Sequence, residues 1–442
     1  MAGAVATPEV QHRELLDGIG AARAGTDRLF EILRQEALYD RPIAERHRII
    51  FYIGHLEAFD RNLLAPGLGL EPFHPEFDKL FAFGIDPVGG GLPSDRPSDW
   101  PSIEQVRRYA HTVRERLDER LARQTAPDRL LNVALEHRLM HAETLAYMFH
   151  QLPLDRKLAP PQAPQPQAQP VTPHIIDIPA GVATLGLPHS KAFGSNPAAF
   201  GWDNEFEAQQ VAVPGFAIDA YNVTNGKFLE FMRAGAYHER SLWSEAGWNW
   251  VQSEKMHHPR FWISSPKDGG DTWLYRTMFD EHPLPLDWPV YVSHAEASAY
   301  ARWLGKALPT EAQFHRAAYG SGNGERDYPW GAEPPEMRHG NFDFHRWDPV
   351  PIGSYPSGRS AFGVEDLVGN GWEWTSSLFG PLPGFEAFAF YPGYSANFFD
   401  GQHYVIKGGS ARTAASLLRR SFRNWFQPHY PFVYAAFRCV EN

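Results

Sequence analysis

The sequence predicts an α+β protein of two domains, in which a four-helix bundle is followed by a domain of short strands and irregular segments. The chain has 442 residues, which is more than one hydrophobic core usually serves. Of its 14 tryptophans only Trp100 lies before residue 172, so the aromatic composition changes abruptly along the chain. Such a change indicates two parts with different kinds of core.

A proline- and glutamine-rich tract, LAPPQAPQPQAQPVTP (158–173), separates the two parts. Its prolines exclude a helix and favour an extended, semi-rigid linker. We therefore predict one domain over residues 1–157, a linker over 158–173, and a second domain over 174–442.

The first domain is predicted to hold four helices, because apolar residues recur there at helical spacing. Helical patterns occur near 9–36, 42–65, 102–124 and 127–152, with a Gly/Pro-rich loop (66–100) between the second and the third. The apolar stripe of the second pattern contains His55, and that of the fourth contains His137 and His141. Pro127 lies near the start of the fourth pattern, where proline is tolerated.

The second domain is dense in glycine, proline and tryptophan, and contains short β-like runs such as QQVAVPGFAID (209–219) and HYVIKGGSA (403–411). One clear helix is expected over 293–305, with Ser293 as its N-cap and Glu296 completing a capping box. So little regular structure implies a fold held together by aromatic packing.

The composition excludes several classes of function. A net charge of −11 argues against broad binding of nucleic acid or anionic lipid. The chain lacks an apolar run of 18 residues and a recognisable signal peptide, so we expect a soluble, cytoplasmic protein. Its single cysteine, Cys439, excludes an intrachain disulfide and a cysteine-rich zinc site, so any metal must be held by histidines and carboxylates.

Three histidines in apolar stripes indicate a metal site. A buried neutral imidazole costs desolvation unless both ring nitrogens find partners. His137 and His141 are four residues apart and point the same way from one helix, and His55 can face them from another. Three imidazoles leave open positions on a divalent transition metal. The alternative is a set of core histidines bonded to carbonyls or carboxylates. Glu143 is a poor co-ligand, because it lies about 200° around the helix from His141.

The pattern of a histidine on the second helix and H-x3-H-x-E on the fourth resembles the DinB-like four-helix bundle. The second domain resembles the formylglycine-generating-enzyme/sulfatase-modifying-factor domain, which has a C-type-lectin-like fold. The matching segments are YNVTNGKFLEFM (221–232), PVYVSHAEASAYARWLGKALPTEAQFHRAA (289–318), DLVGNGWEWTSS (366–377), YVIKGGSA (404–411) and RRSFRNWF (419–426).

Together the two domains resemble the ergothioneine-type sulfoxide synthases, which are non-haem iron enzymes. These enzymes use O2 to couple a sulfur donor to C2 of the imidazole of hercynine. The resemblance implies Fe(II) as cofactor, O2 as co-substrate, and His55, His137 and His141 as the iron ligands. Formylglycine generation itself is not expected, because it requires a reactive cysteine pair and the chain has only Cys439.

The resemblance also implies roles for residues of the second domain. In YPGYSANFF (391–399), Tyr391 corresponds to a catalytic tyrosine that donates a proton, and Tyr394 to a residue lining the hercynine site. Asn424 and Trp425 match residues that bind the hercynine carboxylate and cation. The alternative is that both tyrosines pack the domain. Trp372 and Trp374 are expected in the core.

The chain departs from enzymes of this family that accept γ-glutamylcysteine. Those enzymes bind the donor carboxylates with an Asp directly after the Asn-Trp pair, an Arg four residues further on, and arginines in the loop between helices two and three. Here Phe426 and Tyr430 take the first two positions, and the loop segment FGIDPVGGGLPSDRPSD (83–99) holds only Arg96. Met140 replaces a glutamine that commonly precedes the last iron ligand. A donor with two carboxylates would lose charge-assisted contacts worth about 1.5–3 kcal/mol each.

These departures favour a different donor. The chain resembles most the selenoneine synthase branch, which couples hercynine to a selenosugar, and Phe426 and Tyr430 are then substrate-binding residues. One alternative is a sulfoxide synthase that uses cysteine, γ-glutamylcysteine or another thiol. Another is a metal-dependent thiol transferase or a non-catalytic binding protein.

Overall fold

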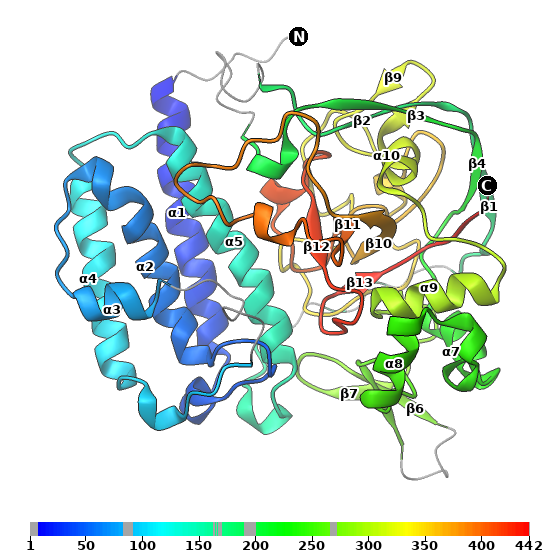
Figure 1. Ribbon diagram of the computed structural model, residues 1–442, viewed down its shortest axis with the longest axis horizontal. Coiled ribbons are helices and arrows are strands. Elements are labelled where there is room, and N and C mark those ends of the chain that lie inside the picture. Colours follow the sequence, from blue (N-terminus) through cyan, green and yellow to red (C-terminus); the bar gives the residue numbers. More distant parts are fainter. Residues whose placement is uncertain are drawn as a thin grey trace. The chain divides into compact units, whose positions relative to one another are not determined.

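A computed structural model describes residues 8–82, 92–161, 164, 166, 170–189, 200–265 and 272–441 (Figure 1). The chain divides into two compact units, Met1–Pro160 with Ser195–Phe200 and Pro161–Gly194 with Gly201–Asn442. The first is helical and the second mixes helices with small sheets, which confirms the predicted α+β class. None of the described helices is both long and apolar enough to span a lipid bilayer.

Four long helices build the first unit. They are α1 (Pro8–Glu31), α2 (Ile49–Leu68), α4 (Ile103–Leu121) and α5 (Asp128–His150). Helix α2 packs against α4 and α5, and α1 packs against α5. Ion pairs between Asp27 and Arg114 and between Arg23 and Asp118 join α1 to α4. Shorter elements fill the connections: η1 (Gln35–Tyr39), α3 (Pro75–Leu80), η3 (Pro97–Asp99) and η4 (Leu154–Arg156).

The observed helices differ from the predicted ones at two ends. Helix α1 ends at Glu31 because Leu33 and Arg34 instead pair with the backbone near Arg156. Helix α2 begins at Ile49 rather than near residue 42, because the side chain of its N-cap Arg48 is hydrogen-bonded to Asp95 and to the carbonyl of Tyr39. Pro127 is the N-cap of α5, in agreement with the sequence.

Small sheets form the framework of the second unit. The largest has the order β12-β11-β10-β13, and another, β1-β4-β14, joins the first strand of the unit to its last. The strands of these two sheets are β1 (Ile175–Ile178), β4 (Phe216–Asp219), β10 (Gly371–Leu378), β11 (Tyr404–Gly409), β12 (Asn424–Phe426), β13 (Ala435–Ala436) and β14 (Val440–Glu441).

Two two-stranded sheets and one three-stranded sheet contain the other described strands. They are β2 (Gly181–Leu185) with β3 (Gln209–Val213), β8 (Gly320–Ser321) with β9 (Gly324–Glu325), and β5 (Trp262–Ser264), β6 (Trp273–Arg276) and β7 (Glu281–Pro283). The runs 209–219 and 403–411 are therefore strands, as predicted.

The described part of the second unit has four α-helices where the sequence predicted one. They are α7 (Asn225–Arg233), α8 (Glu245–Ser253), α9 (His294–Trp303) and α10 (Glu311–Tyr319). The predicted helix is α9, and its capping box between Ser293 and Glu296 is present. Short 3₁₀ turns follow at η5 (Asp203–Glu205), η6 (Ala236–His238), η7 (Arg240–Leu242), η9 (Pro356–Gly358), η10 (Ala396–Phe398) and η11 (Ala415–Leu417).

Aromatic side chains fill the core of the second unit. Trp372 and Trp374 are both buried on β10, as the sequence predicted, and Trp374 donates its indole N–H to the carbonyl of Val292. Arg438 is also fully buried, and its guanidinium forms a bidentate ion pair with Glu373. The pair stabilises the unit because each charge satisfies the other away from water.

Candidate functional site

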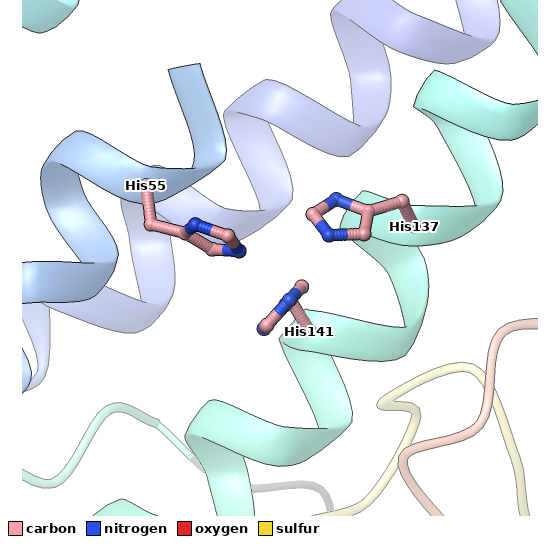
Figure 2. Close-up of side chains that lie close together, drawn as sticks. All are labelled: His55, His137 and His141. Atoms are coloured by element: carbon pink, nitrogen blue, oxygen red, sulfur yellow. The ribbon is translucent and has the colours of Figure 1, made fainter. Parts of the chain in front are cut away.

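Helices α2 and α5 bring His55, His137 and His141 together (Figure 2). One nitrogen of each ring lies within 4.8 Å of a nitrogen of the other two, and the side chains are only 2–3% exposed. His137 and His141 are one helical turn apart on α5, and His55 faces them from α2 (Figure 2). The geometry expected from the sequence is thus formed by these three residues.

Each of the three rings has a buried nitrogen without a hydrogen-bond partner among the described residues. These atoms are Nε2 of His55, Nδ1 of His137 and Nδ1 of His141. The other nitrogen of His55, Nδ1, lies 2.8 Å from the carbonyl oxygen of Phe81. A carbonyl only accepts, so Nδ1 carries the proton and the lone pair of His55 is on Nε2. Metal-binding histidines usually make this kind of second hydrogen bond. The residues therefore fit a divalent transition metal.

The electrostatic environment keeps the three imidazoles neutral. Burial lowers the pKa of His55 to about 4, although the hydrogen bond to Phe81 opposes this shift. Burial also lowers the pKa values of His137 and His141 well below their usual range, and the neighbouring histidines add to the effect. Near neutral pH each ring is therefore uncharged and offers a lone pair. Metal coordination requires such a neutral imidazole.

Aromatic rings pack around the histidines. Phe59 stacks on His137 with 3.4 Å between ring centroids, and Phe51 stacks on His55 at 4.9 Å. Tyr52 lies at the edge of His141, with 5.9 Å between centroids. These contacts hold the rings in place and exclude water from most of their surface.

A buried ion network is formed by residues that are close in sequence to the three histidines on α2 and α5. Arg138, between His137 and His141, forms ion pairs with Glu57 and Asp60 of α2 at 3.0 and 2.9 Å. All three side chains are 1% exposed. Arg114 of α4 donates a further hydrogen bond to Glu57 at 2.8 Å. The network fixes the register of α2 against α5, and with it the positions of the histidines on the two helices.

In the second unit, Tyr391, Tyr394 and Trp425 form one aromatic cluster. The rings of Tyr391 and Tyr394 are 5.5 Å apart, and Tyr394 meets the edge of Trp425 at the same distance. Phe379 stacks on Trp425, with 4.0 Å between the two ring centroids. Three of the predicted site residues thus lie side by side, although 31 positions separate Tyr394 from Trp425 in the sequence.

The sequence did not reveal which residues hold the tyrosine segment, YPGYSANFF (391–399), in place. Tyr394 stacks on Trp202 at 4.0 Å between centroids, and Trp202 is fully buried. The hydroxyl of Ser395 donates to the carboxylate of Asp203 and accepts from the amide of Asn204 at 3.0 Å. Burial raises the pKa of Asp203, which the hydrogen bond from Ser395 opposes. No local signal predicts this contact, because Asp203 and Ser395 are 192 positions apart.

Asn424, Trp425 and Phe426 form strand β12, so successive side chains point to opposite faces. Trp425 points to the tyrosine cluster, and Asn424 and Phe426 therefore point the other way. The Oδ1 atom of Asn424 accepts a hydrogen bond from the backbone N–H of Trp425 at 2.9 Å. Phe426 stacks on Tyr430 with 5.6 Å between centroids and an angle of 6°. The structure thus separates Asn424, Phe426 and Tyr430 from the tyrosine cluster, although all three are predicted to bind substrate.

The remaining predicted positions carry less information. Glu143 and Met140 are half-buried on α5, and Glu143 is not part of the histidine group. Residues 83–91 of the loop compared with the γ-glutamylcysteine enzymes lie outside the described residues. Arg96 is described, and its backbone N–H donates to Asp99 at 2.7 Å.

Comparisons with known proteins agree with this two-part organisation. Residues 160–442 match the sulfatase-modifying factor enzyme 1-like domain, and residues 19–151 match the DinB superfamily. Hercynine oxygenase of Mycolicibacterium smegmatis is 32% identical over 98% of this chain and 99% of its own length.

Two other relatives are matched over only part of their length. Hercynine oxygenase of Mycobacterium tuberculosis is 41% identical over 54% of this chain and 55% of its own length. Ergothioneine biosynthesis protein 1 of Neurospora crassa is 29% identical over 93% of this chain and 56% of its own length. The chain thus spans about half the length of these two relatives.

Proposed function

Because the chain belongs to the ergothioneine-type family, which joins a DinB-superfamily region to a sulfatase-modifying-factor-like domain, we propose that it is an O2-dependent non-haem iron enzyme acting on hercynine. The observation that carries the proposal is the group of three buried histidines, each with a nitrogen that lacks a hydrogen-bond partner among the described residues. His55, His137 and His141 hold the metal. When bound, Fe(II) supplies the redox chemistry by which O2 is reduced.

The reaction forms a carbon–chalcogen bond at C2 of the hercynine imidazole. Joining the C2–H carbon to a Se–H or S–H group releases two protons and two electrons, which reduce O2 to hydrogen peroxide. Where the chalcogen also takes up one oxygen atom of O2, the other oxygen atom leaves as water. Tyr391 acts as the catalytic residue that supplies a proton from its phenol. This role is compatible with its position beside Tyr394 rather than deep in the core, since Tyr391 is only half-buried.

Tyr394, Trp425 and Asn424 bind hercynine. Aromatic faces attract a quaternary ammonium group, and the rings of Tyr394 and Trp425 stand at 78° to each other, which gives two sides of an enclosure. The amide oxygen of Asn424 is engaged with the backbone of Trp425, so its NH2 group is the part available to a carboxylate. The ring pair supports the assignment of the hercynine cation to this region. Asn424 lies on the opposite face of β12 from Trp425, so its contact with the carboxylate rests on the family resemblance.

The donor is proposed to be a selenosugar. Phe426 and Tyr430 occupy the positions where the enzymes that use γ-glutamylcysteine have an Asp and an Arg, and here they stack on each other. A stacked aromatic pair offers apolar faces and one hydroxyl, which suit a sugar ring better than a dicarboxylate. The proposed activity is therefore that of a selenoneine synthase.

The test is reconstitution of the metal-free protein with Fe(II) under anaerobic conditions, followed by hercynine, O2 and one donor at a time. The donors are a selenosugar, cysteine and γ-glutamylcysteine, and mass spectrometry identifies the product. Turnover of the selenosugar without turnover of γ-glutamylcysteine supports the proposal.

Two other outcomes select the alternatives. Turnover of thiols alone makes the protein an ergothioneine-type sulfoxide synthase. Absence of hercynine-dependent O2 consumption with every donor, together with zinc rather than iron in freshly purified protein, indicates a thiol transferase or a binding protein instead.

A further inference from the structure

Gly54, the residue before His55, occupies a position in α2 where any side chain would collide with Phe81. Glycine weakens a helix interior relative to alanine, so its presence in the middle of a 20-residue helix calls for a reason. A Cβ atom at position 54 would lie 2.5 Å from Cγ of Phe81 and 2.6 Å from both Cδ atoms. Ordinary carbon–carbon contacts are about 3.5–4.0 Å, so the ring would have to retreat by about 1 Å.

Phe81 cannot make room by rotating its ring. Its Cγ atom lies on the axis of the ring rotation, so turning the ring leaves Cγ where it is. Only a change at χ1 or a shift of the backbone moves this atom. Phe81 is fully buried. Its ring is surrounded by four other aromatic rings: Phe51, Phe77, Trp100 and Tyr109. A different χ1 would drive the ring into these neighbours, so the backbone at Phe81 must move.

The backbone of Phe81 carries the carbonyl that accepts the Nδ1 proton of His55 at 2.8 Å. Phe81 is the C-cap residue of α3, and α3 is held against the bundle by a hydrogen bond of 2.8 Å from Tyr109 to Asp78. The carbonyl of Phe81 and the imidazole of His55 therefore cannot shift together when a side chain is added at position 54.

We propose that Gly54 and Phe81 form a positioning pair for His55. The absence of a side chain at position 54 admits the ring of Phe81, and the seated ring places the carbonyl that fixes the tautomer and orientation of His55. The imidazole then presents its Nε2 lone pair to a divalent transition metal. Neither residue touches the metal. The inference rests on the proposed metal centre and adds to it two residues that set metal affinity.

The size of the effect follows from other metal sites, where loss of the hydrogen bond behind a histidine ligand lowers metal affinity about 10–100-fold. Gly54→Ala should therefore weaken Co(II) binding by this factor in the full-length protein. Gly67→Ala is the matched control, because Gly67 lies in the same helix and a Cβ there meets no atom within 4 Å. Its Co(II) affinity should stay within about twofold of the parent.

The experiment is an anaerobic titration of metal-free protein with Co(II), followed by the visible absorption of the bound ion. Far-UV circular dichroism checks that each variant is folded. A folded Gly54→Ala variant that binds Co(II) as tightly as the parent overturns the inference.

A second pair of variants tests whether the Phe81 ring carries the effect. In a Phe81→Ala background the ring is gone, so the further change Gly54→Ala should leave Co(II) affinity within about twofold. A drop of 10-fold or more in this background overturns the inference, even if the single variant Gly54→Ala does not fold.

The hydrogen bond can also be observed without metal. Nitrogen-15 NMR of histidine-labelled parent protein should show a slowly exchanging Nδ1 proton that disappears in His55→Ala and exchanges faster in Gly54→Ala. If this proton is absent from the parent, the positioning pair fails. If it is present but the parent binds no Co(II), the positioning geometry stands and the proposed metal centre fails.

Discussion

Arg138, which lies between the two histidines of α5 in the sequence, forms an ion pair of 2.9 Å with Asp60 of α2, and both side chains are 1% exposed. Arg138 also pairs with Glu57, whose side chain is likewise 1% exposed. Burial raises the pKa of Asp60, whereas Arg138 and Arg114 together hold the pKa of Glu57 below its usual value against its own burial. Removal of Arg138 would leave Asp60 with Arg23 at 3.8 Å and Glu57 with Arg114 at 2.7 Å, so the two buried carboxylates would be only partly compensated.

Arg138→Met should therefore destabilise the bundle by about 3–5 kcal/mol. Chemical denaturation followed by circular dichroism measures the change. Arg107→Met is the control, since Arg107 is exposed on α4, and it should change the free energy of unfolding by no more than about 0.5 kcal/mol. Equal stability of the two variants would contradict the importance of the network.

His137→Ala should abolish both iron retention and turnover, because it removes one of the three proposed ligands, and the histidine group includes no carboxylate among the described residues. Elemental analysis after reconstitution with Fe(II) and gel filtration measures retention. His111→Ala is the control, because the His111 side chain is 72% exposed and pairs only loosely with Glu115 at 3.1 Å. Full iron content in an alanine variant at any of the three histidines would show that the ligand assignment is wrong.

Tyr391→Phe should lower kcat by about 10²–10⁴-fold without loss of iron, because it removes only the proposed proton donor. Ser395→Ala should lower kcat by a smaller factor, since it releases the tyrosine segment from Asp203 but leaves the phenol. Ser357→Ala is the control, because Ser357 is an exposed serine outside the segment 391–399. Steady-state kinetics with hercynine measures kcat for each variant. An unchanged kcat for Tyr391→Phe would show that this residue is not the proton donor.

The double variant Phe426→Asp/Tyr430→Arg should gain turnover with γ-glutamylcysteine and lose turnover with a selenosugar. It replaces the stacked pair with the charged residues that the thiol-using enzymes have at these positions. Phe426→Leu/Tyr430→Leu removes the stack without adding charge, and should impair the selenosugar reaction alone. Measurement of kcat/KM for each donor separates the two effects. Unchanged donor preference in the charged variant would place donor selection elsewhere.

Asp366→Asn should stabilise the second unit at neutral pH. Burial raises the pKa of Asp366 from 3.8 to about 6, and the N–H of Gly353 and the charge of Arg438 oppose this shift only partly. The folded state therefore binds the proton more tightly than the unfolded state. The stability that this proton provides is present in full below pH 3.8 and is lost as the pH rises to about 6.

The asparagine keeps a neutral side chain at every pH, and it tolerates the positive φ of 55° at this position. The variant and the parent should be similarly stable near pH 4, and above pH 6 the variant should be more stable by about 2–3 kcal/mol. Thermal unfolding across this pH range measures the difference. Asp327→Asn, at an exposed aspartate, should show no such dependence, and a parallel pH profile for Asp366→Asn would contradict the argument.

The parts of the structure that the sequence predicted depend on local patterns. Helical spacing placed His55, His137 and His141 on two helices, and because a helix fixes side-chain directions, their mutual approach could be expected. The capping box at Ser293 likewise marked the start of α9. The short helices α7, α8 and α10 were missed because nine residues give too little periodicity to distinguish a helix from an irregular segment.

The parts that could not be predicted depend on contacts between distant residues. Phe81 is 26 positions from His55 and directly follows the six-residue α3 in the connection between α2 and α4. Asp203 reaches Ser395 across 192 positions. A glycine inside an apolar helical stripe next to a histidine was a visible signal for close packing at Gly54, although the sequence did not reveal the partner.

The uneven distribution of tryptophan makes the two units separately observable in solution. Thirteen of the 14 indoles belong to the second unit, whereas the long helices belong to the first. Intrinsic fluorescence will therefore report almost entirely on the second unit, and ellipticity at 222 nm mainly on the bundle. Midpoints that differ between the two signals in one denaturation experiment would mean that each unit melts on its own, so that destabilising the proposed iron site need not disturb the unit proposed to bind hercynine.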